Sequence, residues 1–115
     1  MKLRLKGNSV RLRLSQSEVE KLANTGLVDD SVDFVPNPLI YTVHSSTESS
    51  EINVSFRNGW ITVGIPEATT KQWADSNETG IEGAFRGISI LIEKDWACLH
   101  ADDRENEDTF PRPAS

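Results

Sequence analysis

The stretch Glu51–Ile65, EINVSFRNGWITVGI, decides the fold, because it predicts a β-hairpin. Asn58-Gly59 is the favoured pair for a two-residue type I′ turn, in which both positions need positive φ. That turn sets apolar side chains opposite one another on one face: Phe56 with Ile61, Val54 with Val63, and Ile52 with Ile65. A slip by one residue would move every one of them to the other face. Turn chemistry and hydrophobic register therefore agree.

The opening run, MKLRLKGNSVRLRL, predicts a second hairpin around a type II′ turn at Gly7-Asn8. One face of this hairpin collects apolar side chains: Met1, Leu3, Leu5, Val10, Leu12 and Leu14. The other face carries cations, with Arg4 opposite Arg11 and Lys2 opposite Arg13. Like charges directly opposite one another are destabilising unless an anion lies between them. The basic face therefore favours a negatively charged partner.

A short helix is predicted over Ser15–Asn24. Ser15 and Glu18 form a capping box, and Gly26 fits the left-handed position after the last turn. A helix of this length is marginal in isolation, so it must pack on the sheet.

The remaining elements are predicted from alternation and from proline and glycine. They are strands over Leu27–Val35, Leu39–Ser45 and Ala84–Ile92, a short helix over Glu67–Ala74 opened by Pro66, and a loop over Asp75–Gly83. We expect Leu39–Ser45 to pair antiparallel with Ile52–Phe56, which gives a three-stranded meander out to Ile65. The predicted fold class is α+β, a curved and mainly antiparallel sheet of six to seven strands with one or two short helices. No internal repeat is evident.

Length and composition indicate one β-rich domain over residues 1–100, followed by an acidic tail or surface strap over residues 101–115. The 115 residues carry a net charge of −6, which disfavours a nucleic-acid binder. The single cysteine, Cys98, precludes an intramolecular disulfide and favours a reducing compartment. Neither a signal peptide nor a membrane-spanning run is recognisable, so we expect a cytoplasmic protein without membrane contact.

Both ends of the chain carry a resemblance. The run KLRLKGNSVRLRL and the acidic segment that ends in TFPRP resemble a family of small bacterial proteins of unknown function. That resemblance implies a family but no activity, so it assigns no role to any residue.

The predicted partner-binding residues are the cations of the first hairpin: Lys2, Arg4, Lys6, Arg11 and Arg13. Such a face can bind phosphate or an acidic peptide. It can equally be neutralised by the acids between Asp102 and Asp108 of the same chain, or protect a sheet edge. Nucleic-acid readers place aromatic residues among the cations, and none lies near these in sequence.

A weaker candidate is a metal site at Cys98, His100 and Asp102, which would face the same way on a strand. The same cysteine could be a nucleophile if His44 or His100 lay within reach. Ligand motifs for a structural metal normally come in pairs, and a buried free cysteine is the simpler interpretation. We therefore predict no cofactor and assign no catalytic residue.

The sequence thus favours a small binding domain over an enzyme. Its basic hairpin face would engage an acidic or phosphorylated partner, or the chain's own acidic tail. Two alternatives stay open: a small metal- or thiol-dependent enzyme centred on Cys98 and His100, and a homodimer formed through a sheet edge. Trp60 and Trp96 could line a partner surface or lie in the core.

Overall fold

The computed structural model describes residues 1–95 and Phe110, and it contains eight strands and two helices in these residues. One sheet has the order β1 (Lys2–Lys6), β2 (Ser9–Leu14), β8 (Ile88–Lys94) and β7 (Gly80–Phe85). The other has the order β3 (Leu27–Val32), β4 (Leu39–Ser46), β6 (Trp60–Pro66) and β5 (Asn53–Arg57). We call them the first and the second sheet.

The α+β class and the two short helices are confirmed, but the prediction of one curved sheet with six to seven strands is wrong. The two four-stranded sheets share one core, in which Leu12, Val43, Val63 and Ile92 are fully buried. Two pairings are parallel, β2 with β8 and β4 with β6. The meander was therefore wrong too, because β6 inserts between β4 and β5.

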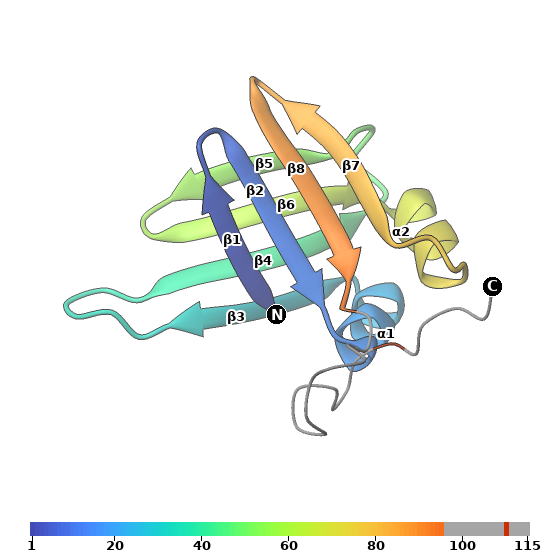
Figure 1. The fold of residues 1–115 in the computed structure, drawn as a ribbon, viewed down its shortest axis with the longest axis horizontal. Coiled ribbons are helices and arrows are strands. Elements are labelled where there is room, and N and C mark those ends of the chain that lie inside the picture. Colours follow the sequence, from blue (N-terminus) through green and yellow to red (C-terminus); the bar gives the residue numbers. More distant parts are fainter. Residues whose placement is uncertain (96–109, 111–115) are drawn as a thin grey trace.

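Helices α1 (Gln16–Thr25) and α2 (Glu67–Ala74) contact each other at one end of the molecule (Figure 1). The capping box of Ser15 and Glu18 and the left-handed Gly26 are present as predicted. Leu22 and Trp73 point into the core and are almost completely buried. Neither helix in the described part of the chain is long and apolar enough to span a bilayer.

The fold repeats itself, which the sequence did not reveal. A hairpin, a helix and a second hairpin occur twice, first as β1–β2–α1–β3–β4 and then as β5–β6–α2–β7–β8. Each sheet contains one hairpin from each half. If β1 to β4 are exchanged with β5 to β8 in order, the strand order of the first sheet becomes that of the second. The registers agree, because Leu12 lies beside Ile92 as Val63 lies beside Val43. The two halves are thus related by a pseudo-two-fold axis.

At the two corners between the sheets, equivalent positions differ in chemistry. Ile52 is the counterpart of Met1, and Gly83 is the counterpart of Asp30. At one corner between the sheets, the Met1 amino group lies 3.1 Å from an Asp30 carboxylate oxygen. At the other corner, Ile52 lies so close to the Gly83 backbone that a β-carbon there would clash with it.

Several predicted element boundaries differ from the structure, and three of them matter for the fold. Arg86 and Gly87 both have positive φ and form the turn between β7 and β8, where the sequence predicted one continuous strand over Ala84–Ile92. β7 begins at Gly80, inside the predicted loop, and β3 ends at Val32. At Asn58 and Gly59 the positive φ values confirm the predicted type I′ turn.

Candidate functional site: the basic face of the first sheet

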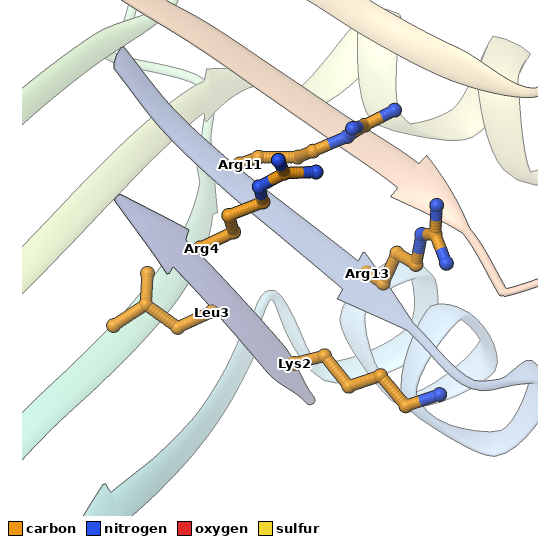
Figure 2. A pocket seen from close by; sticks show the side chains of 5 residues that line it. All are labelled: Lys2, Leu3, Arg4, Arg11 and Arg13. Atoms are coloured by element: carbon orange, nitrogen blue, oxygen red, sulfur yellow. The ribbon is translucent and has the colours of Figure 1, made fainter. Parts of the chain in front are cut away.

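The basic face lies on the outer side of β1 and β2. Val10, Leu12 and Leu14 alternate inward and are buried, so the residues between them point outward. The register sets Arg4 beside Arg11 and Lys2 beside Arg13, as predicted. Figure 2 shows the Arg4 and Arg11 side chains extending together from neighbouring strands, while Leu3 points away from them.

The face is slightly hollowed. A shallow pocket of about 210 Å³ is lined by Lys2, Leu3, Arg4, Arg11 and Arg13. Four of the five predicted cations therefore line one site. Lys6 does not, because it lies at the turn end of β1, opposite Ser9.

One acid belongs to this face that the sequence alone did not indicate. Glu93 on β8 is buried and lies directly beside Arg13 in the parallel register. Its Oε1 is 2.8 Å from Arg13 Nε, which donates a hydrogen bond to it, and 2.8 Å from Arg11 Nε. Arg11 Nε forms no hydrogen bond there, so Arg11 donates only from Nη2, over 3.4 Å to Oε2. One carboxylate thus partly neutralises two guanidinium groups.

The titration of Glu93 reflects these contacts. Burial alone would raise the pKa of its carboxyl group, but the hydrogen bonds and charges of Arg13 and Arg11 outweigh burial, so the pKa lies below its usual value of 4.5. The same pairing raises the pKa of Arg13. Glu93 is therefore a carboxylate throughout the neutral range.

The other two cations at the pocket differ in their partners. Lys2 Nζ lies 3.1 Å from an Asp95 oxygen, but the lysine is mostly exposed, so this ion pair contributes little. Arg4 is exposed and has no acidic partner among the described residues. In the described part of the chain, Arg4 is thus the pocket's least neutralised cation.

The predicted metal site at Cys98, His100 and Asp102 lies outside the described residues. His44, the other candidate base, is exposed on β4 in the second sheet. Within residues 1–95 and Phe110, no group of three or more histidine, cysteine, aspartate or glutamate side chains is placed to hold a metal ion.

Trp60 lies on the outer face of the second sheet and is 45% exposed. Its indole Nε1 donates a hydrogen bond to Thr42 Oγ1 over 2.7 Å. Trp60 is therefore a surface residue. Trp96 lies outside the described residues.

A second missed residue is Lys94, which is buried at the end of β8. Its ammonium group donates to the Ser76 carbonyl and lies 5.7 Å from the centre of the Trp73 ring and 5.5 Å from that of Phe110. Burial lowers the pKa of Lys94, and the charges of Glu78 and Asp75 oppose that effect. Phe110 N donates to the Asp95 carbonyl over 2.8 Å, and the Phe110 side chain packs against the core beside Lys94.

Comparison with known proteins adds a family but no activity. Neither curated proteins nor solved structures gave a significant match. A family model described as a family of unknown function, DUF7009, matches residues 1–114, nearly the whole chain. The match agrees with the resemblance seen at the two ends of the sequence, and the chain belongs to this family.

Proposed function

We propose that this chain is a small binding domain that engages an acidic or phosphorylated partner through the basic face of β1 and β2. The observation that carries the proposal is the pairing of Arg4 with Arg11 across two neighbouring strands, at a pocket lined by two further cations. Two like charges in direct cross-strand register are destabilising in isolation. An anion bound between them would remove that repulsion.

Arginine suits this role because its planar guanidinium group donates two parallel hydrogen bonds to a carboxylate or a phosphate. Glu93 already engages Arg11 and Arg13. An external anion competes with Glu93 for those two, but it meets no such competitor among the described residues at Arg4. Arg4 is therefore the primary contact, and Arg11 is the secondary one.

The acidic tail of the same chain is the second source of such an anion. Residues 101–115, which lie outside the described residues apart from Phe110, contain the acids Asp102, Asp103, Glu105, Glu107 and Asp108. Phe110 lies at the end of β8, the strand that pairs with β2. A tail bound to the basic face would lower the affinity for an external partner.

The experiment measures binding of a phosphoserine peptide and of a glutamate-rich peptide to the full chain by fluorescence anisotropy at low salt. Arg4→Glu should weaken binding of both peptides by about tenfold or more, because a charge-assisted contact is lost and a repulsive one is created. The matched control is Lys21→Glu, the same charge change at an exposed position of α1. Equal affinities for wild type, Arg4→Glu and Lys21→Glu would overturn the proposal.

A variant in the opposite direction sharpens the test. Glu93→Gln removes the internal competitor for Arg11 and Arg13, so it should tighten peptide binding severalfold. Glu82→Gln, an equal charge change on the neighbouring strand β7, should leave the affinity almost unchanged. Weaker binding by a folded Glu93→Gln protein would contradict the proposed role of the basic face.

A homodimer formed through a sheet edge is the second candidate. The described sheets end in the edge strands β1, β7, β3 and β5. The lysines of β1 oppose pairing at that edge, since charged side chains, lysine above all, protect exposed strands. Sedimentation velocity across a range of concentrations decides this candidate, because a monomer at every concentration excludes it.

A further inference from the structure

An apolar groove opens between the two sheets at the end of the molecule away from the helices. It has a volume of about 320 Å³ and an almost entirely apolar lining: Leu5, Val10, Leu39, Val54, Ser55, Phe56, Ile61 and Ile88. Four of the eight residues lie where β2, β4, β6 and β8 begin, whereas α1 and α2 follow the opposite ends of β2 and β6. Figure 1 shows the tips of the β1–β2 and β5–β6 hairpins at the end remote from both helices.

The groove lies on the pseudo-two-fold axis. Six of its lining residues form three equivalent pairs: Leu5 with Phe56, Val10 with Ile61, and Leu39 with Ile88. Both halves of the chain thus supply the same three walls. At the helix end, Leu22 and Trp73 fill the corresponding space.

Two walls of the groove are exposed to a degree unusual for large apolar residues. Leu5 is 55% and Phe56 is 67% exposed, although both belong to the inward-facing rows of their strands. Pockets of roughly 300 Å³ and more with a mainly apolar lining are typical of small-molecule sites. The groove is therefore large enough for the apolar part of a small ligand.

Charge at the mouth of the groove indicates what else the ligand carries. Three of the four strand connections at this end bring a cation: Lys6, Arg57 and Arg86. The fourth, between β3 and β4, contains the acid Asp33. Lys6 directly follows Leu5 and Arg57 directly follows Phe56, so alternation turns these two cations to the outer faces of the sheets, at the rim of the groove. Arg86 also lies over the Phe85 ring, 5.2 Å from its centre.

We propose that the groove binds the hydrocarbon chain of an anionic amphiphile, of which a fatty acid is the simplest example. The chain packs against Phe56, Ile61 and their counterparts, which removes exposed apolar surface from water. The carboxylate stays at the rim, where Lys6, Arg57 and Arg86 supply positive charge. This site is separate from the basic face, because Lys6 is the one cation of the first hairpin that does not line the pocket there.

The test uses the full chain and decanoate, studied by isothermal titration calorimetry below the micelle concentration. Phe56→Ala should weaken decanoate binding by at least about tenfold, since it removes one wall of the groove. The matched control is Phe34→Ala: Phe34 is 59% exposed at the same end of the molecule, but it does not line the groove. An equal loss in both variants, or no binding by wild type, would overturn the proposal.

Head-group charge is tested with decanol and a decyl ammonium salt. Decanoate should bind more tightly than either, and the double variant Lys6→Glu/Arg57→Glu should remove that preference while leaving decanol binding in place. Arg4→Glu, a change on the basic face, should leave decanoate binding unaltered. Equal affinity for the three probes would contradict the assignment of an anionic ligand. A dimer that forms without ligand and is dissociated by Phe56→Ala would show that a second copy covers the groove and would overturn the proposal.

Discussion

At the scale of single residues, Glu93 determines how much positive charge the basic face presents. It sits on a strand that is far from Arg11 and Arg13 in sequence and adjacent to them in space. The two arginines hold its pKa below 4.5 despite burial. Their ion pairs therefore stabilise the folded protein as long as Glu93 is ionised.

The first prediction concerns the pH dependence of stability. A carboxyl group whose pKa is lower in the folded than in the unfolded protein contributes stability above the unfolded value, and that contribution is lost as the pH falls through the folded value. Glu93→Gln should thus lower the melting temperature at pH 7, and the difference from wild type should shrink as the pH falls below about 4.5. Thermal melts followed by circular dichroism across this pH range measure the effect.

Glu82→Gln is the matched control for this prediction. Glu82 is exposed on β7, the next strand of the first sheet, and has no cationic partner among the described residues. Its substitution should change the melting temperature little at any pH. A Glu93→Gln difference that stays constant from neutral to acidic pH would show that ion pairing is not its cause.

At the scale of elements, α2 differs from α1 in one buried polar contact. Thr70 is completely buried in α2, and its hydroxyl accepts a hydrogen bond from Ser45 over 2.9 Å and donates one to the Pro66 carbonyl over 3.3 Å. Val19 occupies the equivalent position in α1 and is buried without a polar group. Helix α2 has no side-chain N-cap, whereas Ser15 caps α1. The Thr70 hydroxyl thus helps to fix the first turn of α2.

The second prediction follows from that contact. Thr70→Val should destabilise the protein by about 1–3 kcal/mol, because it leaves the half-buried Ser45 hydroxyl without its acceptor. Adding Ser45→Ala removes that stranded group, so the double variant should lose less than the sum of the two single losses. Urea denaturation of the four proteins completes the cycle. Additive losses would mean that the two hydroxyls do not interact.

Element prediction from the sequence succeeded where the signal is local. The Asn58-Gly59 turn, the Ser15 capping box and the Gly26 cap each depend on a few neighbouring residues, and all three are present. The turn at Arg86-Gly87 was missed because a non-glycine residue with positive φ is rare outside asparagine and aspartate. Without that turn, the end of β7 and the first part of β8 were predicted as one strand over Ala84–Ile92.

At the scale of the whole molecule, the pairing of strands that are distant in the chain could not be predicted from the sequence. Alternation shows which side chains point inward, but it does not show that β8 lies parallel to β2 or β6 parallel to β4. For the same reason, the cations of the basic face could be predicted and their partner Glu93 could not. Its position depends on the parallel register of two strands at opposite ends of the described chain.

The pseudo-two-fold relation could not be recognised in the sequence, because equivalent positions are similarly buried but are often occupied by different residue types. Leu22 corresponds to Trp73 and Ser15 to Pro66, and the two turns read Gly-Asn and Asn-Gly in opposite order. Only the spacing of apolar residues survives in both halves. Such a pattern is common to many strands, so it does not by itself indicate a repeat.

The third prediction concerns the close contact between Gly83 and Ile52, at one corner between the two sheets. Gly83→Ala should destabilise the protein by about 1–3 kcal/mol, since its new methyl group would overlap Ile52. Ile52→Ala alone leaves a cavity, but in the double variant the new methyl group has room. The double variant should therefore be more stable than the sum of the two single losses predicts, as measured by urea denaturation. Independent losses would contradict the close contact between the two residues.

The most direct test of anion binding at the basic face is a nitrogen-15 NMR titration of the wild-type chain with the phosphoserine peptide. Saturable chemical-shift changes should concentrate on β1 and β2, with the largest at Arg4 and Arg11, and should weaken as salt is added. Strands β3 to β6 of the second sheet should change little. Changes confined to the second sheet, or no saturable change at low salt, would contradict the proposed function.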